Sequence, residues 1–151
     1  MSTNTALGSE RVAIVAAIDP DAYTAAAYSS DYVDMAKFET IQAILLVGTM
    51  ASTSTVAFKL QQATDASGTG AKDITGKAIT TLTQASPDAS DKQAVINCRA
   101  EELDMDNDFR FVKAVMTVAV AASDAGAVIL GMNPVHAPAS DSDLASVAEI
   151  V

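Results

Sequence analysis

Residues 58–82 read FKLQQATDASGTGAKDITGKAITTL: a strand-like run, a small polar loop and a second strand-like run. Ahead of the loop, apolar side chains alternate with small or polar ones, and the set expected to face inward is Val56, Phe58 and Leu60. This period of two predicts a half-buried strand over 52–63. After the loop, a second strand is expected over 77–84.

The loop contains Gly68 and Gly70, but it lacks the GxxxxGK[ST] pattern and no helix is expected after it. A phosphate-binding loop uses the N–H groups at the start of a helix to hold its ligand. Because strands flank these glycines, we expect the loop at 65–76 to turn the chain and to contact a neighbouring protein.

Strand patterns recur along most of the chain. They occupy 11–18, 38–50, 92–103, 109–121 and 125–133. We expect Asp19-Pro20-Asp21 to end the first strand, and SDAG at 123–126 to form a tight hairpin turn between the last two. The run at 38–50 has a continuous apolar middle, which predicts that both of its faces are covered. Roughly seven or eight strands without a long helix predict an all-β, two-sheet sandwich of the jelly-roll type.

The two ends of the chain differ from this pattern. We expect a flexible N-terminal arm at 1–10, the β-sandwich at 11–133 and a C-terminal arm at 134–151. Pro134 and Pro138 interrupt strand formation in that last segment. Apolar residues then fall at helical spacing, so the arm can form a short helix, either frayed or docked. They are Leu144, Val147, Ala148 and Val151.

Charge limits the possible partners. The 151 residues include 19 carboxylates against 9 Lys and Arg, for a net charge of -10. Nucleic acid and anionic membranes both attract basic surfaces, so we expect neither as a partner. No signal peptide is expected, and the longest apolar run is far shorter than the roughly 20 residues of a membrane helix.

Residues that carry chemistry are few. Cys98 is the single cysteine and is expected to be a buried small side chain, not a reactive thiol. Asp104, Asp106 and Asp108 alternate in a way that suits either a turn between strands or a cation site, and the sequence leaves both open. His136 has no second histidine or nucleophile motif with which to form a triad. We therefore expect no catalytic, cofactor-binding or metal-binding residue, and no enzyme.

Several stretches resemble the head-decoration, or cement, proteins of tailed bacteriophages. They are VAAIDPDAY, DYVDM, KLQQATDASGTGAKDITGKAITTLTQ and DKQAVINCRAEELD. The resemblance covers nearly all of 11–133, and its most specific part is LQQATDASGTGAKDITGKAITTLTQ. It implies a jelly-roll or related sandwich, dimeric or trimeric, that clamps neighbouring subunits of the major capsid protein. Such a protein lies on the capsid exterior and is made in the host bacterial cytoplasm.

The sequence suggests where such a protein would touch its partners. One candidate is a face of 38–50. The other partner-binding candidates are Tyr23, Tyr28, Tyr32, Gly68, Gly70, Lys72, Leu144, Val147 and Ile150. Two alternatives remain open: a carbohydrate-binding β-sandwich displayed on the virion, for which only the tyrosines offer platforms, and a head-completion or tail protein. Copy number in the particle would separate the last from a cement protein.

Overall fold

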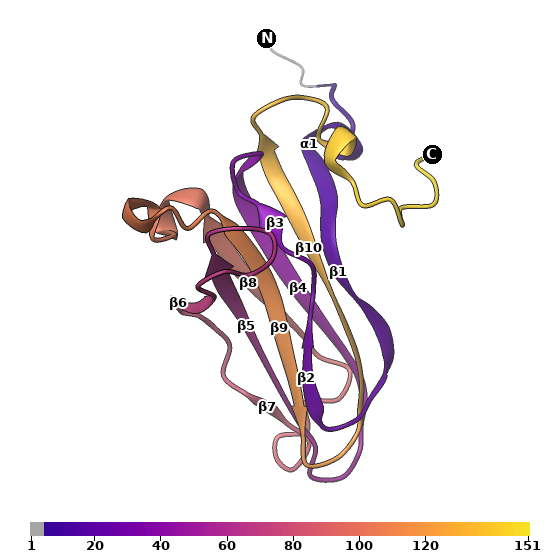
Figure 1. The fold of residues 1–151 in the computed structure, drawn as a ribbon. Helices are drawn as coiled ribbons and strands as arrows, with labels where there is room; N and C mark the ends of the chain where they lie inside the picture. Colours follow the sequence, from indigo (N-terminus) through magenta and orange to yellow (C-terminus); the bar gives the residue numbers. More distant parts are fainter. Residues whose placement is uncertain (1–4) are drawn as a thin grey trace.

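The computed structural model describes residues 5–151, which form two antiparallel sheets packed face to face (Figure 1). Sheet A has the strand order β1-β10-β4-β8. Its strands are β1 (Val12–Tyr23), β10 (Ser123–Pro134), β4 (Phe38–Met50) and β8 (Gln93–Arg99).

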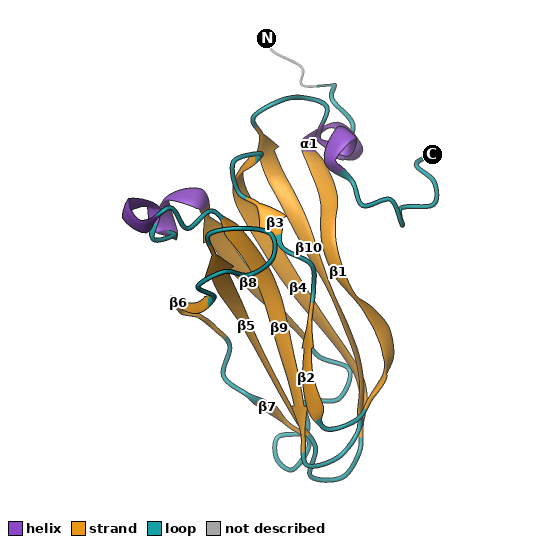
Figure 2. Ribbon diagram, viewed as in Figure 1, coloured by secondary structure: helices purple, strands orange, loops and turns teal. Residues whose placement is uncertain are grey.

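Sheet B has the order β2-β9-β5-β6, with two short strands at its margins. Its strands are β2 (Ala26–Ser29), β9 (Phe111–Ala119), β5 (Thr55–Ala63), β6 (Lys72–Ala78), β3 (Val33–Asp34) and β7 (Leu82–Thr83). Helical turns lie at the ends of the strands (Figure 2). They are α1 (Gly8–Arg11), η1 (Ala100–Glu102), η2 (Met105–Asn107) and η3 (Ala139–Ser142).

The strand pairs are nested, and this nesting identifies the topology. β5 pairs with β6, β4 with β8, β2 with β9, and β1 with β10, all antiparallel. Nested pairs of this kind form when one long hairpin folds over on itself. The folded hairpin also pairs β10 with β4 and β9 with β5. With four main strands in each layer and the short strands β3 and β7 added to sheet B, this arrangement is a jelly roll. The predicted fold class is therefore confirmed.

The core between the sheets follows the predicted alternation. In β5, the inward side chains Val56, Phe58 and Leu60 are all buried. β9 contributes Val112, Ala114, Met116 and Val118, which are buried as well. Close packing reaches the backbone at Gly131 on β10, where an added Cβ would lie 2.7 Å from the Phe38 ring. Burial of each large side chain stabilises the fold by about 1.5–3 kcal/mol. The buried residues are the ones that the alternating pattern predicts to face inward.

Three local predictions are wrong. Asp19-Pro20-Asp21 does not end the first strand, because β1 continues to Tyr23 through a bulge between Ile18 and Asp21. β1 is an edge strand, and proline is tolerated at edges and bulges since no ladder N–H is required there. The sequence SDAG is not a hairpin turn: β10 begins at Ser123, and β9 and β10 belong to different sheets.

The third difference lies after the loop. β6 begins at Lys72 and ends at Ala78, so the strand starts earlier than the predicted 77–84 and the loop is shorter than 65–76. Ile79 and Leu82 pack against the core, with Leu82 in the separate strand β7. The Asp and Lys at the start of β6 pair with β5, and these cross-strand contacts outweigh the polar, loop-like composition of the segment.

The C-terminal segment forms no helix after Ser142. The backbone of Asp143 is extended (φ -60°, ψ 148°), and its carboxylate accepts a hydrogen bond from the Ile14 N–H at 2.7 Å. The Leu144 N–H donates to the Ile14 carbonyl at 2.8 Å. A short helix is marginal in water, and here the Asp143 carboxylate and the Leu144 N–H bind the free edge of β1 instead.

The N-terminal segment lies at the same end of the sandwich. Residues 1–4 of the predicted flexible arm fall outside the described residues. Gly8–Arg11 form the single turn of α1, beside η3 at the end where the chain terminates (Figure 1). Within residues 5–151, no helix is both long and apolar enough to cross a membrane.

Candidate interaction surfaces

The outer face of sheet A carries a row of apolar side chains across all four strands. Strand register aligns Ala17 of β1 with Val128 of β10, Val128 with Ile44 of β4, and Ile44 with Val95 of β8. Their neighbours facing the core, such as Ile18, Ala127 and Leu45, are buried. In antiparallel strands, successive residues point to opposite faces, so the aligned row points away from the core.

Adjacent rows extend this apolar surface. We define the apolar face as Ile14, Ala17, Ile44, Leu46, Val95, Val128 and Leu130. Leu46 is 52% exposed and Val95 is 49% exposed, so water reaches its centre and its β8 edge. The prediction that both faces of 38–50 are covered is half right: the inner face is buried, and the outer face is apolar but open. One face of this strand is a predicted partner surface, and the outer face is the one that stays exposed.

A groove of about 670 Å³ opens at the Tyr23 end of the apolar face. Two closely packed glycines form part of its lining. A Cβ at Gly126 would lie 3.0 Å from the Pro20 Cα, because the β1 bulge folds over this residue. A Cβ at Gly48 would lie 3.2 Å from the Asp124 Cβ. Leu46 and Val128 line the same groove.

Three carboxylates border the groove: Asp19, Asp21 and Asp124. Among residues 5–151, no Lys or Arg lines it. Asp21 accepts a hydrogen bond from the Ala22 N–H at 2.7 Å. From the sequence, Asp19 and Asp21 are expected only to end a strand, and it is the β1–β10 register that places them beside Asp124.

The β5–β6 loop, residues 64–71, is prefolded by its own aspartate. One Asp65 carboxylate oxygen accepts hydrogen bonds from the N–H groups of Ser67 (2.9 Å) and Thr69 (3.0 Å), and the other accepts from the Thr69 hydroxyl at 2.6 Å. The Thr69 hydroxyl is the largest cause holding the pKa of Asp65 below its ordinary value. The N–H groups that would cradle a phosphate are already used, which agrees with the predicted turn.

This loop brings two predicted partner residues together. Gly68 has a positive φ of 89°, and a Cβ there would lie 2.9 Å from the Tyr32 hydroxyl oxygen. The hydroxyl is buried without a hydrogen-bond partner within residues 5–151. Lys113 lies over the Tyr32 ring at 5.1 Å. Tyr32 and Gly68 therefore pack against each other instead of projecting outward.

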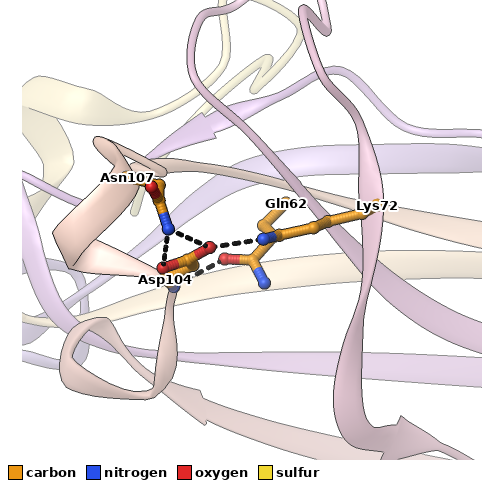
Figure 3. A network of polar contacts seen from close by, with 4 residues as sticks. All are labelled: Gln62, Lys72, Asp104 and Asn107. Carbon is orange, nitrogen blue, oxygen red and sulfur yellow. Dashed lines mark hydrogen bonds and ion pairs between the residues drawn. The ribbon is translucent and has the colours of Figure 1, made fainter.

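Lys72 is also held within the chain. Figure 3 shows its ammonium paired with the carboxylate of Asp104, which also accepts hydrogen bonds from the Asn107 amide at 2.9 and 3.0 Å. The Asp104 N–H donates to the Gln62 side chain at 2.8 Å. The hydrogen bond from Lys72 is the largest cause lowering the pKa of Asp104. Lys72 also lies 4.1 Å from the centroid of the Phe109 ring, and a Cβ at Gly70 would lie 3.6 Å from the same ring.

The same network places Asp104, Asp106 and Asp108 around the turn η2. Asp104 is bound by Lys72, and Asp106 and Asp108 lie in and just after the turn η2. Within residues 5–151, no group of three His, Cys, Asp or Glu side chains is placed to hold a metal ion. The structure agrees with the turn that the sequence left open.

The remaining predicted residues lie at two separate places. Tyr23 and Tyr28 pack with their ring centroids 4.3 Å apart, and their hydroxyls donate to the carbonyls of Asp19 and Thr24. Leu144 lies beside Ile14 at the end where the chain terminates, and Val147 and Ile150 follow it. The nine predicted residues therefore do not form one site.

Cys98 lies inside the sandwich, as predicted. Its side chain is buried, and burial is the largest cause that raises the pKa of its thiol to about 11. At neutral pH the sulfur is therefore a neutral thiol, which is the unreactive form.

No protein-family model matches the chain, and no curated protein matches it. Three solved structures are similar over most of its length. A chain of infectious bursal disease virus, Gx strain, is 11% identical with a TM-score of 0.43, and the match covers 86% of this chain and 34% of that one. For the Gt strain the values are 7%, 0.39, 85% and 33%.

The third is a chain of Bacillus endospore appendages, which form disulfide-linked pili. It is 17% identical with a TM-score of 0.31, and the match covers 87% of this chain and 99% of that one. The chain spans about a third of the length of the two viral chains. At these identities, its function has to be inferred from its own surfaces.

Proposed function

We propose that this chain is a non-catalytic structural protein of a tailed-phage virion. In this role it is a decoration, or cement, protein that binds the exterior of the head and clamps neighbouring major capsid subunits. The observation that supports this role best is the apolar face on the outside of sheet A. Antiparallel sheets commonly present polar side chains on the face turned away from the core. Sheet A departs from that rule over seven side chains.

The open apolar face suits a protein that joins a larger assembly. Large exposed apolar patches on otherwise soluble chains mark interaction sites. Exposed Leu46 and Val95 lie near the middle and the β8 edge of this patch, where a partner would remove them from water. Each square ångström of apolar surface buried contributes about 25 cal/mol, and a standard interface buries about 1,600 Å² in total.

Charge explains how such a face remains usable before assembly. A net charge of -10 makes free copies repel one another. A capsid lattice would hold copies side by side, where they associate as dimers or trimers, and many weak contacts then act together. Because the clamp binds the assembled lattice and not its separate subunits, it stabilises the head by mass action.

A carbohydrate-binding role has less support. Sugar sites use flat aromatic platforms, but the Tyr23 and Tyr28 rings pack against each other at an interplanar angle of 49°. Their hydroxyls are hydrogen-bonded to nearby carbonyls. The remaining tyrosine, Tyr32, has its hydroxyl buried beneath the β5–β6 loop.

The test uses heads stripped of this protein. Stripped heads should release DNA at a lower temperature, and adding the wild-type chain should restore the original release temperature. Leu46→Asp places a charge in the apolar face and should not restore it. Val135→Asp changes a similarly exposed valine outside the face and should behave like wild type. Equal restoration by both variants would remove the apolar face from the mechanism, and no effect of the wild-type chain would contradict the clamp.

A further inference from the structure

The groove beside Gly48 and Gly126 differs from the rest of the apolar face in shape and in charge. It follows β10 from Asp124 to Val128, with β1 on one side and β4 on the other. Its volume of about 670 Å³ lies within the range of about 300–1,000 Å³ typical of ligand sites. A groove that runs along strands suits an extended segment of chain rather than a compact small molecule.

The lining selects for apolar side chains at the centre of that segment. Leu46, Val128 and Ala17 contribute hydrocarbon, and Pro20 contributes its ring. Gly48 and Gly126 add no side chain to this lining. A Cβ at Gly48 would lie 3.2 Å from the Asp124 Cβ, whereas one at Gly126 would lie 3.0 Å from the Pro20 backbone, so Gly48 is the better position for a substitution.

The rim selects for positive charge at the ends of the segment. Asp19, Asp21 and Asp124 surround the apolar lining, and no cationic side chain lines the groove to neutralise them. A second copy of this chain is a poor occupant, since it has a net charge of -10 and would bring further carboxylates to the rim. Phosphates and nucleic acids are excluded for the same reason.

We propose that this groove binds an extended segment of a partner protein that has an apolar centre flanked by Lys or Arg. The inference deepens the proposed function, because on a head the segment would belong to a capsid subunit. The contact with apolar side chains gives affinity. The three aspartates give specificity, because they attract a cationic segment and fix its register in the groove. Binding should weaken with salt, since charges at an exposed rim are screened.

The first experiment measures peptide binding to the full-length protein by fluorescence anisotropy. The probe is a labelled peptide of sequence Lys-Lys-Leu-Val-Leu-Val-Lys-Lys. One comparison peptide replaces every Lys by Glu, and another replaces the apolar centre by Ser. The Lys-flanked peptide should bind about tenfold or more tightly than either, and raising salt from about 50 mM to about 300 mM should weaken it. Equal binding of the Glu-flanked peptide, or no binding of the Lys-flanked one, overturns the proposal.

The second experiment places the binding in the groove. Gly48→Leu fills the space and should abolish peptide binding. Gly8→Leu is the matched control, because a Cβ at Gly8 meets nothing within 4 Å and lies away from the groove. Both variants are checked by circular dichroism and thermal melting. Retained binding by folded Gly48→Leu, or equal loss in both variants, contradicts the assignment.

A third comparison tests the rim. The triple change Asp19→Asn, Asp21→Asn and Asp124→Asn should weaken the Lys-flanked peptide about tenfold. Asp31→Asn, Asp106→Asn and Asp141→Asn make the same change in net charge away from the groove and should leave binding unchanged. An equal effect of both triples would mean that net charge, and not the rim, attracts the peptide. If the rim triple variant binds the peptide as wild type does, the groove is rejected as the peptide site. If Leu46→Asp still fails to restore the heads, the proposed function stands without the groove.

Discussion

The two outer faces of this jelly roll have opposite chemistry. On sheet B, outward side chains find partners within the sheet: Lys59 pairs with Asp73 at 2.9 Å, and Gln61 donates to the same carboxylate at 2.8 Å. On sheet A, the row from Ala17 to Val95 has no polar atom in its side chains. One amide pair, Gln42 with Asn97, borders that row. The outer face of sheet B is therefore polar, as is usual for a face in water. The outer face of sheet A has the apolar composition that is typical of a face covered by another layer.

The two edges of sheet A differ in a related way. The β1 edge is covered where the C-terminal segment binds Ile14 through Asp143 and Leu144. It is also interrupted by two irregularities in its pairing with β10. β8, the other edge, pairs with β4 in unbroken register and has no strand on its far side within residues 5–151. Natural sheets usually protect their edges in one of these ways, so the open edge and the open face meet at Val95.

The largest effect is expected inside the sandwich, where both sheets share one core. Phe58→Ala removes a side chain that is 1% exposed and should lower the free energy of unfolding by about 3–5 kcal/mol. Leu46→Ala removes a side chain of the outer face and should change it by less than about 0.5 kcal/mol. Urea denaturation of the two variants measures the difference. A large loss in Leu46→Ala would mean that the apolar face is already covered in the free protein.

A smaller effect is expected at the edge of sheet A. Asp143→Ala removes the acceptor of the Ile14 N–H and should lower the free energy of unfolding by about 0.5–1.5 kcal/mol. Hydrogen exchange at the Ile14 amide should become faster in this variant, because the C-terminal segment no longer holds it. Asp141→Ala, two residues earlier, is the control. Unchanged exchange in Asp143→Ala would show that the C-terminal segment does not cap β1.

The strands and the core could be predicted because the alternation at Val56, Phe58 and Leu60 is a local signal. The pairing of strands could not be read in the same way. β1 passes through Pro20 only because a bulge and an edge position make a proline acceptable, and both depend on β10. Ser123 begins a strand in the opposite sheet from β9, so a turn-like sequence there joins two layers instead of two paired strands.

For the candidate surfaces too, local features could be predicted from the sequence, but contacts between distant residues could not. One face of 38–50 was predicted as a partner surface from its composition, and the structure keeps that face exposed. Lys72 and Gly68 were chosen because their loop is polar and rich in glycine, yet Asp104 and Tyr32 hold them within the chain. Those partners are far away in sequence. The apolar row and the acidic rim depend on register across strands, which a single strand does not reveal.

Acid should lower the stability of sheet B and of the loop between β8 and β9. The pKa of Asp73 is lowered chiefly by the hydrogen bond from Gln61, and that of Asp104 chiefly by the one from Lys72. A lowered native pKa adds stability that is present above the ordinary value of 3.8 and is lost as pH falls through the native value. The urea midpoint should therefore fall between about pH 5 and about pH 3. Asp73→Asn should reduce that fall, and an unchanged fall in this variant would contradict the assignment.

The smallest effect concerns the one thiol, which lies under the open edge of sheet A. Cys98 is buried on β8, and the raised pKa of about 11 keeps its sulfur protonated at neutral pH. A thiol-reactive dye should therefore leave the native protein unlabelled at about pH 7 and label one cysteine per chain in urea. Val95→Cys gives the matched exposed thiol, because Val95 lies on the outer face of the same strand. Fast labelling of wild-type Cys98 would show that β8 opens readily, and the edge would then be a mobile strand instead of a fixed surface on which a partner can dock.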